Sequence, residues 1–179
     1  MPDEQMNRPH AIIVMGVSGC GKSSVGEKLA EALHLAFVEG DALHPAANVE
    51  KMSKGIPLTD DDRMPWLDRI GEDIKASLEK SDGIIVSCSA LKRLYRDRLR
   101  AAASGNLFFV YLEGSRALLM KRMGERKGHF MPVSLLDSQL ATLEVPTGEP
   151  GVVTVDIDDT VDGIAATALD GLATLGVTG

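Results

Sequence analysis

One eight-residue motif constrains this chain more than any other feature. Residues 16–23 read Gly-Val-Ser-Gly-Cys-Gly-Lys-Ser, which fits the pattern of a glycine, four residues and then Gly-Lys-Ser. An apolar run at residues 11–15 precedes the motif and an amphipathic stretch at residues 23–34 follows it, so the motif lies between an expected strand and an expected helix. Glycines let backbone N–H groups turn inward around a phosphate, and the following helix adds the positive end of its dipole. The motif therefore predicts a site for a nucleoside triphosphate.

The side chains of this phosphate loop have separate expected contacts. Lys22 supplies a point charge for the β- and γ-phosphates, and Ser23 offers a hydroxyl to Mg²⁺. The glycine spacing differs from that of a dinucleotide-binding loop, which excludes that class of site. We expect the nucleotide to be bound by Gly16, Val17, Ser18, Gly19, Cys20, Gly21, Lys22, Ser23 and Ser24.

Short apolar runs alternate with amphipathic stretches along the rest of the chain. Strands that are apolar on both faces and separated by helices are typical of a parallel sheet covered on both sides. We therefore expect an α/β protein of three layers, with a five-stranded parallel sheet flanked by helices. The expected strands are residues 11–15, 35–38, 83–88, 107–112 and 152–157. The expected helices are residues 23–34, 45–54, 59–78, 91–103 and 115–126, one ending at residue 144 and one opening at residue 160.

Length and charge narrow the classes of function. A chain of 179 residues fits one domain, so we expect residues 1–179 to form a single domain with a substrate-binding region at about residues 41–67. The formal net charge of −7 has the wrong sign for binding nucleic acid or an anionic membrane through bulk charge. The apolar runs fall far short of the roughly 18 residues that span a bilayer, and residues 1–10 lack the apolar segment of a secretory signal. Because there are only two cysteines, Cys20 and Cys88, we expect no disulfide scaffold and a cytoplasmic protein.

The acceptor of the phosphate is sought beyond the carboxyl ends of the strands, where open α/β sheets bind ligands. A GTPase is disfavoured because the chain has no Asn-Lys-x-Asp string, and its Asp-x-x-Gly string lies inside an amphipathic helix. Asp41, just past the second strand, is a candidate base for an attacking hydroxyl, and His44 could hydrogen-bond a neighbouring hydroxyl. The alternative is that Asp41 belongs to a simple turn and His44 to a helix surface.

Two groups of cations are candidates for contacts with anionic substrates. Arg63 and the Lys92–Arg96 cluster fall near strand ends, and a carboxylate-bearing substrate needs such partners. Arg122 and Arg126 are one helical turn apart, before a glycine break, and suit a mobile lid at about residues 122–134 that closes on phosphates. The alternative for both groups is a solvated helix surface.

Several long strings in the chain strongly resemble the gluconokinase family. Together with the phosphate loop, they extend the resemblance from about residue 12 to residue 157. They read Gly40-Asp41-Ala42-Leu43-His44-Pro45, Asn48 and Lys51-Met52, Gly55-x-Pro57-Leu58-x-Asp60-x-Asp62-Arg63-x-Pro65-Trp66-Leu67, Cys88-Ser89-Ala90-Leu91-Lys92, Tyr95-Arg96-Asp97, Gly128-His129-Phe130-Met131 and Ser138-Gln139-x-x-Thr142-Leu143-Glu144-x-Pro146.

The resemblance implies ATP-dependent phosphorylation of D-gluconate at its 6-hydroxyl, with ATP and Mg²⁺ as cofactors. It implies a P-loop NTPase fold akin to that of shikimate and nucleoside monophosphate kinases, usually as a homodimer. Asp41 would be the base, and the segment with Arg122 and Arg126 would be the lid. The implied catalytic residues are Lys22, Asp41 and Arg126, and Arg122 would contact the nucleotide. The implied substrate-binding residues are Asp41, His44, Arg63, Lys92, Arg96 and His129.

Two positions depart from related patterns, and two other functions stay open. Glu39 stands where the family more often has Asp, and Ser87 occupies the strand end where many phosphate-loop enzymes place a metal-holding Asp. The alternatives are another small-acid kinase, such as shikimate kinase, and a nucleotide-binding regulatory module without catalysis. The family strings disfavour the first, and the intact phosphate loop with Asp41 and the lid arginines disfavours the second.

Overall fold

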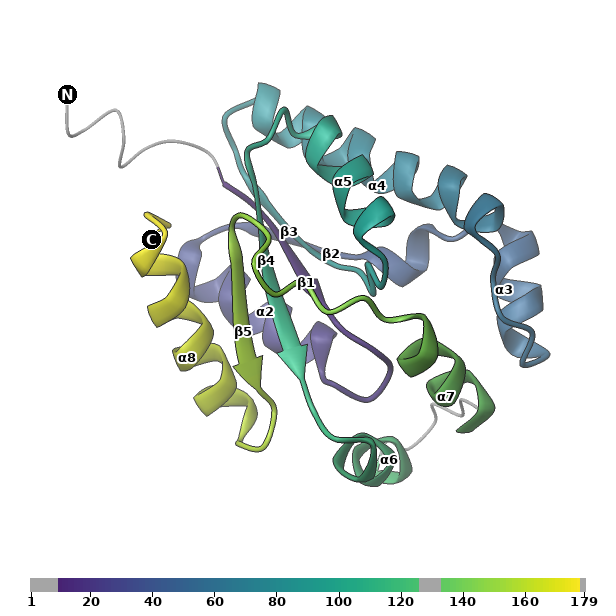
Figure 1. The fold of residues 1–179 in the computed structure, drawn as a ribbon. Helices are drawn as coiled ribbons and strands as arrows, with labels where there is room; N and C mark the ends of the chain where they lie inside the picture. The colour runs from purple at the N-terminus through teal and green to yellow at the C-terminus, as the bar shows by residue number, and fades with distance from the viewer. Residues whose placement is uncertain (1–9, 126–132, 178–179) are drawn as a thin grey trace, which may run out of the picture.

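The computed structural model describes residues 10–125 and 133–177, which form one sheet with helices on both faces (Figure 1). The strands are β1 (Ala11–Met15), β2 (Ala36–Glu39), β3 (Ile84–Ser87), β4 (Leu107–Glu113) and β5 (Val152–Asp156). The helices are α2 (Lys22–Leu33), α3 (Ala46–Ser53), α4 (Asp60–Glu79), α5 (Arg93–Ala102), α6 (Arg116–Glu125), α7 (Val133–Thr142) and α8 (Val161–Thr174), with a 3₁₀ helix η1 (Gly40–Leu43).

The five strands are all parallel and lie in the order β2-β3-β1-β4-β5. All five residues of β1 are fully buried, which explains why this continuous apolar run lies at the centre of the sheet. The chain leaves β1 toward β2 and β3 on one side and later reaches β4 and β5 on the other. The loop after β1 therefore lies at the point where the strand order reverses, the usual ligand position in such sheets. The predicted α/β fold with a five-stranded parallel sheet is confirmed.

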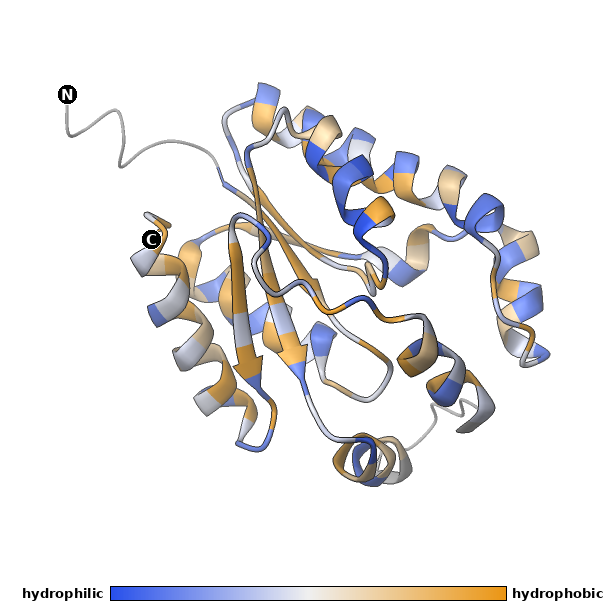
Figure 2. Ribbon diagram, in the orientation of Figure 1, coloured by the Kyte–Doolittle hydropathy of each residue, from blue (hydrophilic) through white to orange (hydrophobic). Residues whose placement is uncertain are grey.

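Helices cover the two faces of the sheet in separate pairs. Helices α2 and α8 pack together on one face, and α4 packs with α5 on the other (Figure 1). Figure 2 shows the matching distribution of hydropathy, with apolar strands in the middle and polar residues on the outer sides of the helices. Among the described residues, no helix is both long enough and apolar enough to cross a membrane.

Helix α4 begins where the sequence predicts it. Thr59 caps the helix, because its hydroxyl accepts a hydrogen bond from the Asp62 N–H at 3.1 Å. The Asp62 carboxylate accepts in return from the Thr59 N–H at 2.9 Å, which completes a capping box. The start of α4 is therefore specified locally, and it places Arg63 and Trp66 within the first two turns.

The structure differs from the sequence-based expectation mainly after β2. Residues 40–43, which were not assigned to a helix, form η1, and Gly40 at its start lies against Ser87 at the end of β3. A Cβ atom on Gly40 would lie 1.9 Å from the Ser87 carbonyl oxygen, so only glycine permits this approach. The lid expected at about residues 122–134 falls largely outside the described residues.

Candidate active site

The phosphate loop connects β1 to α2 and lies against α6. Gly19 has a φ of 86°, and a Cβ atom there would lie 2.9 Å from the Leu119 carbonyl oxygen and 2.8 Å from Met123 Cγ. The loop thus packs directly on α6, with a backbone conformation that favours glycine. Gly21, at the N-cap of α2, has no side chain that could occupy the first N–H groups of the helix. These N–H groups and the helix dipole suit a bound phosphate.

Lys22 places a positive charge over this loop. Its ammonium group donates to the Val17 carbonyl at 3.1 Å and lies 3.9 Å from the sulfur of Cys20. The side chain is half-buried and lines the pocket described below. The Lys22 ammonium group can therefore contact a phosphate bound in the loop and a group bound in the neighbouring pocket.

Glu39 links the phosphate loop to the end of β3. The Ser23 hydroxyl donates to one oxygen of the Glu39 carboxylate at 2.6 Å, and the Ser87 hydroxyl donates to the other at 2.6 Å. Glu39 and Ser87 are register partners on adjacent parallel strands, so their side chains emerge together. The sequence did not determine the roles of Glu39 and Ser87. In the structure, hydrogen bonds through the Glu39 carboxylate connect Ser87 to Ser23.

These oxygen atoms fit the chemistry of Mg²⁺. Hydroxyl and carboxylate oxygens are its preferred ligands, and Mg²⁺ usually takes one or two protein groups together with phosphates and water. Within residues 10–125 and 133–177, the structure has no cluster of three or more His, Cys, Asp or Glu side chains that could hold a metal alone. The donor set around Ser23 therefore suits a metal that arrives with a nucleotide.

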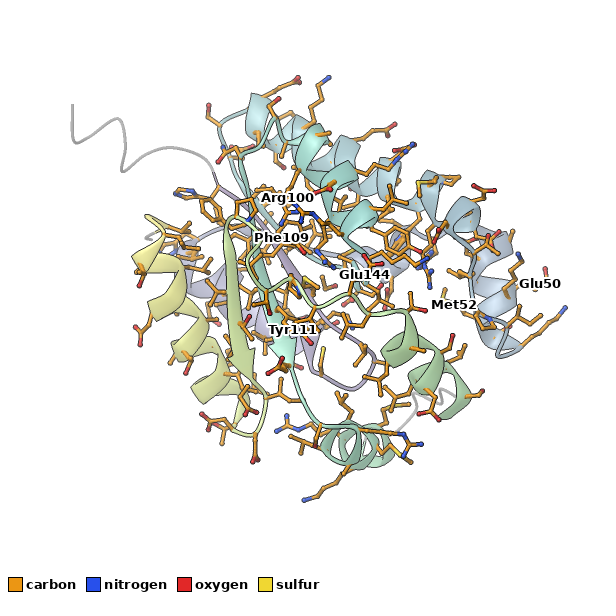
Figure 3. All side chains as sticks on the ribbon, viewed as in Figure 1. Glu50, Met52, Arg100, Phe109, Tyr111 and Glu144 are labelled. Carbon is orange, nitrogen blue, oxygen red and sulfur yellow. The ribbon has the colours of Figure 1, made fainter. Side chains whose placement is uncertain are left out.

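A pocket lies between the phosphate loop, η1, α4 and α7. Five residues predicted from the sequence line it, namely Ser18, Lys22, Asp41, His44 and Arg63. Asp41 is exposed and comes from η1, and it is the only carboxylate among the described residues lining the pocket. Apolar walls come from Met52, Leu58, Trp66, Leu91 and Leu135. Figure 3 shows Met52 on the side of α3 that faces the body of the molecule, opposite Glu50. The pocket can thus hold a polar substrate beside the phosphate loop.

His44 forms one wall of the pocket and is held in place on two sides. Its ring stacks on Trp66 with 4.0 Å between ring centroids and 16° between planes, and its Nδ1 lies 3.2 Å from the Asn48 amide nitrogen. Burial lowers the pKa of His44 to about 4, with Asp41 opposing this change and Arg63 reinforcing it. His44 is therefore neutral at physiological pH.

Arg63 is the pocket end of a hydrogen-bonded chain of polar side chains. Its guanidinium donates to the Tyr95 hydroxyl at 2.7 Å, and that hydroxyl donates to the Asp60 carboxylate. Lys92 donates to the same carboxylate at 2.9 Å, and the bonds from Tyr95 and Lys92 lower the pKa of Asp60. Lys92 was expected to contact substrate, but it does not line the pocket. Hydrogen bonds connect it to Arg63 through Asp60 and Tyr95.

Arg96 was also expected to bind substrate, and the structure corrects this. Its side chain is fully buried and makes a bidentate ion pair with Glu149, at 2.9 Å and 2.6 Å. It also donates to the backbone carbonyls of Ala90 and Glu144, each at 2.8 Å. Four of its five N–H groups are therefore engaged inside the protein. Arg96 ties the β3–α5 connection to residues 144–149 and does not reach the pocket.

A second hollow lies beside α6. Leu118, Lys121 and Arg122 of α6 line it, together with residues 158–160 of the β5–α8 loop. The Arg122 guanidinium donates to the carbonyls of Ile157 and Asp159 at 2.5 Å and 2.9 Å, so it fixes α6 to that loop. The helix α6, which lines this hollow, also packs on Gly19 of the phosphate loop. Two other predicted site residues, Arg126 and His129, lie outside the described residues.

Gln139 and Trp66 line the pocket although neither is among the residues predicted from the sequence. The Gln139 side-chain oxygen accepts a hydrogen bond from the Ser18 N–H at 2.7 Å, so α7 contacts the phosphate loop directly. Both residues occur in strings that resemble the gluconokinase family, and Trp66 is the only tryptophan of the chain. These two features are the only ones in the sequence that could have indicated a role in the site, because neither residue belongs to a charge pattern or a metal-binding motif.

Several known proteins that are similar to this chain over most of its length are gluconokinases. A family profile described as an AAA domain matches residues 12–146. The gluconokinase of Gluconobacter oxydans (strain 621H) is 50% identical over 148 residues, which cover 83% of this chain and 83% of that protein. The thermoresistant gluconokinase of Escherichia coli (strain K12) is 43% identical over 162 residues, which cover 90% and 92%. The crystal structure of a gluconokinase from Sinorhizobium meliloti 1021 superposes with a TM-score of 0.88 and 57% identity, covering 94% of each chain.

Proposed function

This chain belongs to the gluconokinase family, and we propose that it phosphorylates D-gluconate at the 6-hydroxyl with ATP, giving 6-phospho-D-gluconate and ADP. One observation supports this proposal most strongly. A single pocket joins Lys22 of the phosphate loop to Asp41, His44 and Arg63. A phosphate donor and a polar, anionic acceptor can therefore meet in one place.

The phosphate loop and the hollow beside α6 suit the two ends of ATP. The triphosphate would lie in the loop of residues 16–24, with its β- and γ-phosphates facing Lys22. The adenine base of ATP would lie between α6 and the β5–α8 loop, beside Arg122. In this arrangement the γ-phosphate points to the pocket that Lys22 also lines.

Gluconate would occupy that pocket, with its 6-hydroxyl near Asp41. The hydroxyl oxygen attacks the γ-phosphorus, the bond from this phosphorus to the bridging oxygen of ADP breaks, and the hydroxyl proton passes to the Asp41 carboxylate. Lys22 stabilises the negative charge that develops on the transferred group. Arg63 offers a cation to the gluconate carboxylate, and His44 offers a hydrogen bond to another oxygen.

Mg²⁺, when bound, would neutralise charge on the β- and γ-phosphates. Ser23 is the residue proposed to hold it, with Glu39 and Ser87 supporting the Ser23 hydroxyl. Arg126 is proposed as a further catalytic cation and His129 as a substrate contact. These two assignments rest on the family string Gly128-His129-Phe130-Met131, which contains His129 and follows Arg126 by two residues.

The family also supports proposals about assembly and location. We propose that the chain is a homodimer in the cytoplasm and has no nucleic-acid or membrane partner. The net charge of −7 agrees with the absence of such polyanionic partners. Sedimentation of the purified chain at several concentrations tests the dimer directly.

The experiment for this function is a coupled assay of ADP release with and without D-gluconate. We expect release to require gluconate in the native chain and to be lost in Lys22→Ala, which removes the phosphate-directed charge without disturbing the core. ADP release that is equal with and without gluconate would contradict the proposal. Such a result would favour a nucleotide-binding module with another role.

A further inference from the structure

We propose that Asn48 is a positioning residue that holds His44 as the neutral tautomer with its proton on Nε2. In this state His44 is a fixed hydrogen-bond donor to one oxygen atom of the bound sugar acid. The identity of that ligand rests on the proposed function, but the tautomer itself is a property of the protein without substrate.

The contacts of Asn48 determine which of its amide atoms faces His44. Asn48 Nδ2 lies 2.9 Å from the backbone carbonyl oxygen of Asp62, and a carbonyl can only accept a hydrogen bond. The atom at that position must therefore be the amide nitrogen and not the oxygen. The same nitrogen lies 3.2 Å from His44 Nδ1.

This arrangement leaves one possible proton position on the neutral imidazole. The amide nitrogen of Asn48 has two hydrogens, one for the Asp62 carbonyl and one for His44 Nδ1. His44 Nδ1 must then accept, so it has no hydrogen, and the ring proton is on Nε2. Asn48 is only 3% exposed, which keeps water from replacing it as the donor.

The ring plane of His44 is fixed independently of the tautomer. Trp66, against which the ring stacks, is 1% exposed and donates from its indole nitrogen to the Gly40 carbonyl at 2.8 Å. Asn48 from α3 and Trp66 from α4 thus hold the imidazole before any substrate arrives. A donor fixed in advance loses less conformational entropy when a ligand binds.

Burial also favours the neutral ring, because it disfavours the charged form of His44. Of the charged groups that face the ring, Asp41 from η1 favours protonation and Arg63 from α4 opposes it. A second ring proton would have to sit on Nδ1, where it would face the hydrogens of the Asn48 amide. His44 therefore donates from Nε2 and does not accept a proton, which leaves proton acceptance to Asp41.

The first test is ¹⁵N NMR of the histidine rings in the ligand-free native chain at pH 7.5. We expect the His44 ring to carry its proton on Nε2, with its signals assigned by their loss in His44→Gln. A ring protonated on Nδ1, or an even mixture of the two tautomers, would overturn the proposal. This readout needs no substrate, so it stands or fails separately from the proposed function.

The second test replaces the donor at Asn48 by an acceptor. In Asn48→Asp, a carboxylate facing Nδ1 should move the ring proton to Nδ1 and raise the pKa of His44. Trp66 is the only tryptophan and stacks on this ring, so its fluorescence follows the protonation of His44. We expect the fluorescence midpoint of the variant at a higher pH than that of the native chain, with circular dichroism confirming the fold. An unchanged tautomer and midpoint would contradict the role of Asn48.

Kinetics separate this role from a purely structural one. We expect Asn48→Ala to raise KM for gluconate by about tenfold with little change in kcat, because the lost contact is an orienting hydrogen bond. His44→Gln keeps a donor near the position of Nε2, so adding Asn48→Ala to it should raise KM no further. The matched control is Lys51→Ala, which breaks the neighbouring 2.8 Å ion pair between α3 and Asp62. A KM increase in this control equal to that of Asn48→Ala would overturn the proposal.

Discussion

The buried ion pair between Arg96 and Glu149 leads to a prediction about stability. Glu149→Gln keeps the size of the side chain and removes its charge. The Arg96 side chain is 0% exposed and the Glu149 side chain 5% exposed, so Arg96 would lose its carboxylate partner in a site closed to solvent. Arg100, which donates to the same carboxylate at 2.9 Å, would lose this partner as well. Breaking one partner of such a pair costs about 3–5 kcal/mol of unfolding free energy. For a chain of this size, that loss lowers Tm by about 6–20 °C.

The same helix supplies a matched control. Arg98 of α5 makes a bidentate pair with Asp68 at 2.7 Å and 2.9 Å, but the two side chains are 44% and 52% exposed. Because water solvates these charges, Asp68→Asn should cost no more than about 1 kcal/mol. Each carboxylate makes a bidentate pair with an arginine of α5, so the two variants compare this pair at different burial, with Arg100 as an additional partner of Glu149.

Urea unfolding followed by the fluorescence of Trp66 measures both variants. Equal losses of stability in Glu149→Gln and Asp68→Asn would refute the structural role of Arg96 and reopen its assignment to the substrate. The ion pair also has a pH signature, because Arg96 lowers the pKa of Glu149 in the folded chain. This part of the stability is present above the unfolded pKa of about 4.3 and is lost as pH falls through the folded pKa. The Glu149→Gln variant should lack this pH-dependent contribution to stability.

Three further substitutions test the active site. Asp41→Asn should retain gluconate binding and lose kcat, because an amide cannot accept the proton; unchanged kcat with a lower Tm would instead favour the turn interpretation. Arg63→Ala should raise KM for gluconate by about tenfold or more through the loss of a charge-assisted hydrogen bond, and an unchanged KM would exclude its contact with the carboxylate. Arg122→Ala should raise KM for ATP more than KM for gluconate. A larger increase in KM for gluconate would show that the adenine of ATP binds elsewhere.

The features that could be predicted from sequence have local determinants. The phosphate loop needs glycines and Lys22 at fixed spacing between a strand and a helix, and all of these are adjacent in the chain. The strand β1 is apolar at every position, so its place in the middle of a parallel sheet also follows from its composition. Thr59 and Asp62 specify the start of α4 through a four-residue capping pattern.

The features that could not be predicted depend on pairs that are distant in sequence. Arg96 has the same local pattern as a substrate-binding arginine, and only its pairing with Glu149, 53 residues away, reveals a structural role. Glu39 and Ser87 meet because β2 and β3 are neighbours in register, which the order of strands along the chain does not specify. The contact of Gln139 with the Ser18 N–H likewise requires the position of α7.

The most direct test of the central claim is the substrate selectivity of the native chain. ADP release is measured with D-gluconate, D-glucose and shikimate, and the phosphorylated carbon of the product is located by NMR. We expect phosphate on O6 of gluconate, and kcat/KM for gluconate roughly 10⁴-fold above the others, because a site built to hydrogen-bond one substrate leaves its polar groups unpaired with another. Glucose or shikimate matching gluconate in kcat/KM would contradict the account and leave only a phosphate-loop kinase of unassigned substrate.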